Sequence, residues 1–181
     1  MNFQTERLQI RPILESDEAE IFAIHSDAET CRYMLHEPWT DATRAEAFSK
    51  RLKQNQLSQA SPVTLAVVLD NQVIGELFVW YTEMKETVEI GYVFNRAFHG
   101  HGYAFEAIKA LLERLFTDFS IHRVQANLDA RNKASEKLCY RLGMRKEAHF
   151  LQDYWTKGEW TDSFVFGLLQ EEFVSNKKIE S

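Results

Sequence analysis

The chain has 181 residues, of which 45% are hydrophobic and 13% aromatic, with only 7 Gly and 3 Pro. This composition excludes a disordered, collagen-like or low-complexity protein, because it supplies enough apolar side chains to fill a core. A net charge of −6 without a basic run makes the chain a poor candidate for binding nucleic acid or an anionic membrane. The length predicts a single domain over residues 1–175, followed by a polar tail over residues 176–181.

The cysteines and histidines give no sign of a disulfide framework or a metal site. Cys31 and Cys139 are too few for such a framework, and the spacing of the six histidines matches no metal-ligand motif. The first ten residues lack the features of a signal peptide, and no run reaches the ~18 apolar residues of a membrane helix. We therefore expect a cytoplasmic protein with no bound metal and no membrane partner.

The first half of the chain predicts one strand, two helices and three further strands. Ser16 and Asp17 are placed to cap the first helix. Short polar connections between the last three strands favour an antiparallel meander. Periodicity and propensity place these elements at residues 7–11, 19–24, 41–56, 63–69, 73–81 and 88–94.

An aromatic connection over residues 31–39 separates the two predicted helices. It contains Tyr33, Met34 and Trp39. These side chains could form hydrophobic packing or the wall of a substrate cleft, because ligand pockets are themselves lined by apolar groups. Both interpretations stay open.

The second half predicts a long amphipathic helix, a strand, a shorter helix and a closing hairpin. Gly143 suits the left-handed C-cap of the shorter helix. The connection over residues 155–162, which contains Lys157 and Gly158, suits a hairpin turn. The elements cover residues 104–119, 123–129, 134–142, 144 onward and 163–169, so we expect an α/β protein with a mixed sheet.

The segment from His99 to Ala104, HGHGYA, carries the clearest chemical signal. Gly100 and Gly102 let the backbone turn sharply and approach a ligand, and the helix that follows begins with free N–H groups. These features suit a pyrophosphate, although an ordinary tight turn is the alternative. A dinucleotide-binding motif is excluded, because Phe105 stands where its third glycine would be.

Several ordered blocks together resemble the GNAT superfamily of N-acetyltransferases, and within it the RimJ/RimL-like branch. The segment HGHGYA fits the superfamily motif Gln/Arg-x-x-Gly-x-Gly/Ala except that His99 replaces Gln or Arg. The other blocks are TERLQIRP, VEIGYVFN, HRVQANLDARNKASEKLCYRLGMRKEA and KGEWTDSFVFGLL.

The resemblance implies a strongly bent, mostly antiparallel mixed sheet with splayed central strands, flanked by helices. It also implies acetyl-CoA as cosubstrate. Pantetheine would bind the backbone of Val93 and Phe94, and the pyrophosphate would bind the turn formed by His99, Gly100, His101, Gly102, Tyr103 and Ala104. Asn132 and Ser135 match a second cofactor motif, although short polar residues at that place also cap a helix.

Acetyl transfer to an amine needs a base, and the resemblance places it at Glu89. Within its predicted strand, Glu89 points to the opposite face from its apolar neighbours. A solvent-facing glutamate is the alternative interpretation. Glu106 lies in the first turn of the long helix, where the helix dipole alone explains a negative charge.

The proton donor for the departing thiolate is less clear. Many members carry a tyrosine seven residues after the position of Asn132, whereas this chain has Cys139 there. Tyr140 follows, but one residue rotates a helical side chain by about 100°. Cys139 is a weak candidate for the acid, or a small buried residue that only packs.

The resemblance implies an N-acetyltransferase that transfers acetyl to a primary amine, on a protein N-terminus or a small molecule, by direct attack in a ternary complex. The alternative is a non-catalytic acyl-CoA-binding or regulatory domain. The final strands could pair across a homodimer.

Overall fold

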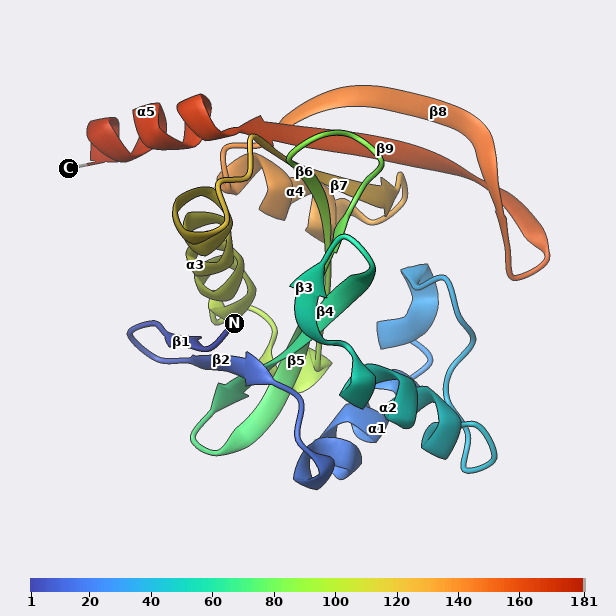
Figure 1. The fold of residues 1–181 in the computed structure, drawn as a ribbon. Coiled ribbons are helices and arrows are strands. Elements are labelled where there is room, and N and C mark those ends of the chain that lie inside the picture. The colour runs from blue at the N-terminus through green and yellow to red at the C-terminus, as the bar shows by residue number, and fades with distance from the viewer. Residues whose placement is uncertain (181) are drawn as a thin grey trace. The chain divides into compact units, whose positions relative to one another are not determined.

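The computed structural model describes the backbone of residues 1–180 and the side chains of residues 1–175 (Figure 1). The chain forms two compact units. The first contains Met1–Trp80 and Gly91–Ala107, and the second contains Tyr81–Ile90 and the chain from Ile108 onward. Strand β6 (Thr87–Phe94) and helix α3 (Tyr103–Asp118) each contribute to both units.

The sheet of the first unit contains strands that pair only antiparallel with one another. Strand β1 pairs with β2, β2 with β4, β3 with β4, and β4 with β5. The turn between β4 and β5 has positive φ at Asp70 (48°) and Asn71 (67°), as a two-residue type I′ turn requires. This confirms the predicted hairpin. The strands are β1 (Phe3–Gln4), β2 (Gln9–Pro12), β3 (Asn55–Ser58), β4 (Ser61–Leu69) and β5 (Gln72–Tyr81).

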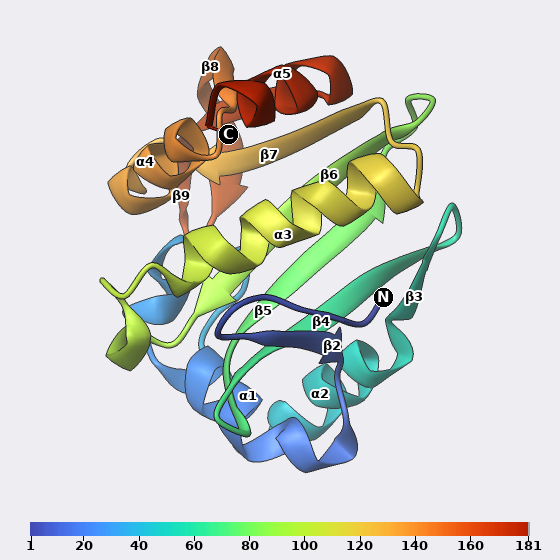
Figure 2. The same ribbon diagram turned by 90° about the vertical axis from the view of Figure 1, so that its left-hand side faces the viewer.

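Two helices, α1 (Glu18–Ser26) and α2 (Arg44–Lys53), belong to the same unit (Figure 2). Helix α2 is shorter than predicted, because the chain continues as β3 from Asn55. Asp17 stands at the N-cap position of α1, as predicted, but its side chain makes no capping hydrogen bond to that helix. Its buried carboxylate instead accepts hydrogen bonds from both terminal nitrogens of Arg11, at 2.7 and 2.8 Å, and from the backbone of Leu14 at 2.8 Å.

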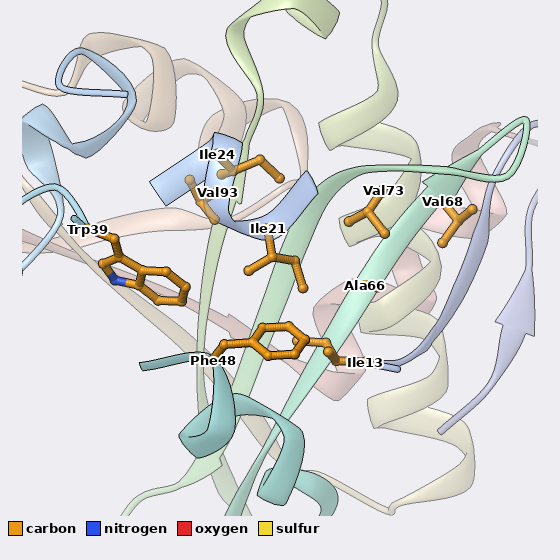
Figure 3. Close-up of a cluster of buried hydrophobic side chains, with 9 residues drawn as sticks. All are labelled: Ile13, Ile21, Ile24, Trp39, Phe48, Ala66, Val68, Val73 and Val93. Atoms are coloured by element: carbon orange, nitrogen blue, oxygen red, sulfur yellow. The ribbon is translucent and has the colours of Figure 1, made fainter. Parts of the chain in front are cut away.

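The core of the first unit lies between these helices and the strands (Figure 3). Trp39 is 8% exposed within this core, and Met34 packs against it. Trp39 and Met34 therefore form hydrophobic packing, the first of the two interpretations of the aromatic connection. The core residues are Ile13, Ile21, Ile24, Trp39, Phe48, Ala66, Val68, Val73 and Val93.

The second unit pairs its strands in a mixed pattern. The first residues of β6 run parallel to β7 (Arg123–Asp129), with Glu89 opposite Gln125. Strand β9 (Glu159–Leu169) is antiparallel to both β7 and β8 (Arg145–Thr156). The turn between β8 and β9 is only Lys157 and Gly158, so both strands extend further into the predicted connection than the sequence indicated.

Two helices of the second unit, α3 and α4, follow the predicted periodicity. The apolar stripe of α3 is fully buried, and Phe116 packs against Phe173 with ring centroids 5.2 Å apart. Helix α4 (Lys133–Arg141) is followed by Gly143 with φ 80°, the left-handed conformation that the sequence predicts for the end of this helix. Helix α5 (Gln170–Glu180) was not predicted, and it includes residues 176–180 of the expected polar tail, while residue 181 lies outside the described residues.

Over the described residues, no helix combines the length and the hydropathy that crossing a bilayer requires.

Gly75 allows β5 to approach the end of β6 closely. A Cβ atom at residue 75 would lie 2.7 Å from the carbonyl oxygen of Val93 and 2.6 Å from the ring of Phe94. The carbonyl is backbone, so it can move only if the strand moves. Gly91, three residues before Phe94, has more room, because a Cβ there would meet nothing closer than a ring carbon of Phe78 at 3.4 Å.

We predict that Gly75→Ala lowers the free energy of unfolding by about 1–3 kcal/mol, the usual cost of overpacking a core. Gly91→Ala serves as the matched control and should change it by less than about 1 kcal/mol, because its methyl group makes ordinary contacts. Urea unfolding of both variants measures the difference. Equal stability of the two variants would contradict the close approach.

Candidate functional site

The turn from His99 to Ala104 has the open backbone that the sequence predicts for an anion site. Gly100 and Gly102 have φ of 81° and 82°, which residues with a side chain rarely adopt. Nothing lies within 4 Å of the place where a Cβ of residue 100 would be. Helix α3 starts at Tyr103, so the N–H groups of its first turn have no acceptors within the helix. The turn can therefore present amide hydrogens to an anion.

His99, the residue that departs from the family motif, connects the turn to β6. Its Nε2 atom lies 3.2 Å from the carbonyl oxygen of Phe94. His101 supports the turn from within, because its Nδ1 lies 2.8 Å from the carbonyl oxygen of His99. The turn and the expected pantetheine-binding residues Val93 and Phe94 thus lie together in the first unit. The carbonyl of Phe94 is engaged by His99 in this arrangement.

Three side chains hold the beginning of α3 against the N-terminal segment. Glu106 accepts hydrogen bonds from the hydroxyl of Thr5 at 2.5 Å, and from the Nε and backbone nitrogen of Arg7 at 2.7 and 3.0 Å. Arg7 also donates to the carbonyl of His101 at 3.1 Å, and its guanidinium lies 4.6 Å from the ring centroid of Tyr103. Arg7 therefore contacts the turn directly.

The charge of Glu106 is favoured by these contacts. Partial burial raises the pKa of its carboxyl. The hydrogen bonds from Thr5 and Arg7 and the positive charge of Arg7 together lower the pKa by more than burial raises it, so it lies below its ordinary value. The helix dipole is thus not the full explanation of Glu106, because the side chain also anchors the turn through Arg7.

In the second unit, Glu89 lies half-buried on β6 between the buried residues Val88 and Ile90. Burial raises the pKa of its carboxyl, and a hydrogen bond from Gln125 Nε2 at 2.8 Å opposes part of that rise. The parallel register of β6 and β7 places these two residues opposite each other. A carboxylate with a raised pKa is suited to accept a proton from an amine.

Asn132 caps helix α4. Its side-chain oxygen accepts a hydrogen bond from the backbone nitrogen of Ser135 at 3.1 Å. This confirms the capping role that the sequence offers for Asn132. The side-chain nitrogen of Asn132 is a separate donor, so a cofactor contact stays a prediction.

Cys139 lies on α4 and has 0% of its surface exposed. That degree of burial is typical of a cysteine that packs as a small apolar residue. Tyr140, the next residue, is 52% exposed and packs edge-on against Phe166, with ring centroids 5.1 Å apart. The two side chains therefore face different surroundings, as the rotation along the helix predicts.

Two groups of predicted residues thus have defined local structure. The turn, Val93 and Phe94 belong to the first unit, whereas Glu89, Asn132, Ser135 and Cys139 belong to the second. The sequence analysis missed Thr5 and Arg7 as supports of the turn and Gln125 as the partner of Glu89. A signal existed only for Gln125, through the register of two predicted strands.

The chain matches known proteins over most of its length. Residues 7–145 match the family model described as an acetyltransferase (GNAT) domain. N-acetyltransferase YnaD of Bacillus subtilis is 30% identical, with 96% of this chain and 99% of that protein covered. N-acetyltransferase p20 of Bacillus licheniformis is 32% identical, with 94% and 97% covered.

A solved structure extends the similarity to three dimensions. The acetyltransferase (GNAT family) from Bacillus anthracis has a TM-score of 0.84 at 27% identity, with 94% of this chain and 99% of that chain covered. The fold is thus mixed α/β with a mostly antiparallel sheet, as the resemblance implied. GNAT acetyltransferases use acetyl-CoA, so the predicted cosubstrate class is also that of the family. The chain therefore belongs to the GNAT acetyltransferase family and is an N-acetyltransferase.

Proposed function

We propose that this enzyme transfers the acetyl group of acetyl-CoA to a primary amine by direct attack in a ternary complex. The observation that carries the proposal is the turn at residues 99–104, where two glycines with positive φ and the start of α3 leave room and amide hydrogens for a diphosphate. In this proposal the turn binds the pyrophosphate, and the backbone at Val93 and Phe94 binds pantetheine. Asn132 and Ser135 are proposed as further cofactor contacts.

Glu89 is the proposed general base. An amine is mostly protonated at neutral pH and must lose a proton before it can attack the thioester carbonyl. The raised pKa of Glu89 brings its basicity closer to that of the group it serves, and the hydrogen bond from Gln125 orients the carboxylate. The proton passes to Glu89 directly or through a water molecule, and the amine nitrogen forms the new bond to the acetyl carbon.

The carbon–sulfur bond of the tetrahedral intermediate then breaks, and the CoA thiolate leaves. We assign no side chain as the acid for this step, because the complete burial of Cys139 favours packing over proton donation. The nitrogen loses its second proton as the amide forms, and water can carry that proton to the thiolate.

Two acceptor classes have support among more distant relatives. Spermidine N(1)-acetyltransferase of Escherichia coli is 21% identical over 94% of this chain. The [ribosomal protein uS5]-alanine N-acetyltransferase of Escherichia coli is 30% identical, but over only 49% of this chain. Both names describe acceptors with an amine, and the net charge of −6 favours a cationic acceptor. We therefore propose a primary amine, tested with one representative of each class.

Incubation with acetyl-CoA and either spermidine or a peptide with N-terminal alanine should release free CoA thiol, which a thiol reagent measures. CoA binding without thiol release, with either acceptor and with a wider amine panel, would instead support a non-catalytic acyl-CoA-binding domain. Calorimetry with CoA alone separates binding from turnover. Absence of CoA binding would contradict the assignment of the turn.

Glu89→Gln should lower kcat/KM by about 100-fold or more at neutral pH, because general bases contribute at least that much. In the native enzyme kcat/KM should rise with pH as Glu89 ionises, with a midpoint at a pKa above the ordinary glutamate value. This rise forms the acidic limb of the pH profile, and the variant should lack it. Glu83→Gln, which changes an exposed glutamate, is the matched control.

Gln125→Leu tests the same base without removing it. The leucine cannot donate a hydrogen bond to the ionised carboxylate, so the pKa of Glu89 should rise further and the acidic limb should move to higher pH. The pH dependence of kcat/KM measures this movement. A limb that stays in place would show that another group titrates.

Arg7→Ala should weaken CoA binding by about 10-fold, which is equivalent to about 1.4 kcal/mol and to the loss of one charge-assisted hydrogen bond. The reason is that Arg7 connects Glu106 to the carbonyl of His101 and so holds the turn. Arg114→Ala, which removes an arginine paired with Asp118 further along α3, is the control. Calorimetric titration with CoA measures both variants, and equal affinities would contradict the role of Arg7.

A further inference from the structure

A cluster of nitrogen and sulfur donors lies in the first unit, apart from the residues assigned to acetyl transfer. It consists of His25 at the end of α1, Cys31 in the short 3-10 helix Thr30–Tyr33, and His36 in the following connection. One donor atom from each side chain lies within 4.8 Å of the other two. His25 and Cys31 have 0% of their surface exposed.

The proton on the ring of His25 can be placed from its neighbours. Its Nε2 forms a close contact with the carboxylate of Glu76, which is fully buried and paired with Arg51 Nε at 3.2 Å. Arg51 Nη2 also lies 3.3 Å from Nε2, but the contact with the carboxylate is much closer, and an ionised carboxylate can only accept; Nε2 therefore carries the hydrogen. The lone pair is then on Nδ1, which is buried and has no hydrogen-bond partner.

His36 shows the same arrangement with a backbone group. Its Nδ1 lies 2.8 Å from the carbonyl oxygen of Glu37, so Nδ1 carries the hydrogen and the lone pair is on Nε2. In metal sites a histidine ligand almost always donates its second ring N–H to a carboxylate or a backbone carbonyl. His25 has the first kind of partner and His36 the second.

Packing fixes the rings in this arrangement. The ring of His25 stacks on Trp39, with centroids 4.4 Å apart and planes inclined by 16°. The ring centroids of the two histidines are 5.1 Å apart. Cys31 lies beside them, and its thiol donates to the carbonyl of His25 at 3.1 Å.

From these contacts we propose that His25 Nδ1, Cys31 Sγ and His36 Nε2 form a binding site for one zinc ion. Imidazole and thiolate are the ligands that zinc prefers, and three protein ligands with a water molecule complete a tetrahedron. Donors on one tetrahedral zinc lie about 3.4–3.6 Å apart, given zinc–nitrogen and zinc–sulfur bonds of about 2.0–2.3 Å. The donors would therefore move together by about 1 Å.

Binding changes the protonation of one group. Zinc binds a thiolate, so Cys31 loses its proton to solvent as the zinc–sulfur bond forms, and its hydrogen bond to His25 is lost. The carboxylate of Glu76 stays in contact with Nε2 of His25, and its own charge is balanced by Arg51. Arg51 faces Nε2 of His25, at 3.3 Å, and is already paired with Glu76. The ion would connect α1, the 3-10 helix and the connection before Trp39.

No metal site was expected, because neither the two cysteines nor the six histidines form a metal-ligand pattern in the sequence. The fold brings the three residues together because the chain reverses after α1. This inference is independent of the proposed acetyl transfer, since it involves none of the residues assigned there.

The test is zinc binding to the metal-free full-length protein, measured by competition with a chromophoric chelator. We expect one zinc ion per chain and a melting temperature raised by about 5 °C or more when free zinc exceeds its dissociation constant about 100-fold. Cobalt, used as a probe in place of zinc, should produce a sulfur-to-cobalt charge-transfer absorption band.

Cys31→Ser should weaken zinc binding by at least about 100-fold and abolish that band, since loss of a residue that only hydrogen-bonds to a metal ligand already costs about 10–100-fold. Cys139→Ser, which changes the other buried cysteine, should keep both the zinc affinity and the charge-transfer band. Near-UV circular dichroism checks that each variant is folded. If Cys31→Ser does not fold, His36→Gln, at a less buried position, replaces it with the same expected loss of affinity.

Stoichiometric zinc binding that depends on Cys31 or His36 would support the site. Failure of the native protein to bind zinc, equal affinity of the native protein and a folded variant, or a cobalt complex without the charge-transfer band would overturn it. None of these results depends on acetyl transfer, so the zinc site and the proposed function can fail separately.

Discussion

The ion pair between Arg7 and Glu106 holds the turn at residues 99–104 in place, and the proposed binding of CoA depends on this turn. A turn that presents backbone amides to an anion must keep its shape without a side-chain core of its own, because its glycines contribute no packing. Here Glu106 anchors the start of α3 to the N-terminal segment, and Arg7 reaches from that segment to the carbonyl of His101. His99 adds a second support from the end of β6. The open surface of the turn thus depends on contacts made behind it.

The proposed base illustrates how a modest environment can adjust a carboxyl group. Glu89 is neither fully buried nor fully solvated, and burial raises its pKa while Gln125 limits the rise. A fully buried carboxylate would need a cation to stay charged, as Glu76 has in Arg51. The two glutamates therefore represent two solutions to the same electrostatic problem, one suited to proton transfer and one to holding helices in place.

Periodicity predicted most of the elements, because burial of an apolar face imposes the same pattern on helices and strands wherever they occur. Helix α3 and the hairpin of β4 and β5 are clear examples. The missed features depend on other forces. Strand β1 is only Phe3–Gln4, too short for a pattern, and α5 carries charged residues in its first turn and lacks a clear apolar stripe. Asp17 has the right identity for a cap, but the partly buried Arg11 competes for its carboxylate.

In the candidate site, the glycine turn and Glu89 could be predicted from the sequence, because their residue types and positions indicate an anion-binding turn and a base. The supports of the turn could not be predicted, since Thr5 and Glu106 are 101 positions apart and only the tertiary structure joins them. The same limit applies to His25 and Glu76, which are 51 positions apart.

The carboxylate of Glu76 links two helices to β5, because His25 belongs to α1 and Arg51 to α2. Loss of Arg51 would leave the buried charge of Glu76 without a cation, and loss of His25 would leave the carboxylate without a hydrogen-bond donor, whereas replacement of all three residues by apolar ones of similar volume would remove both problems. Glu76, His25 and Arg51 are therefore expected to change together in evolution. Relatives should retain the trio or exchange it as a whole for an apolar contact, and single exchanges should be rare.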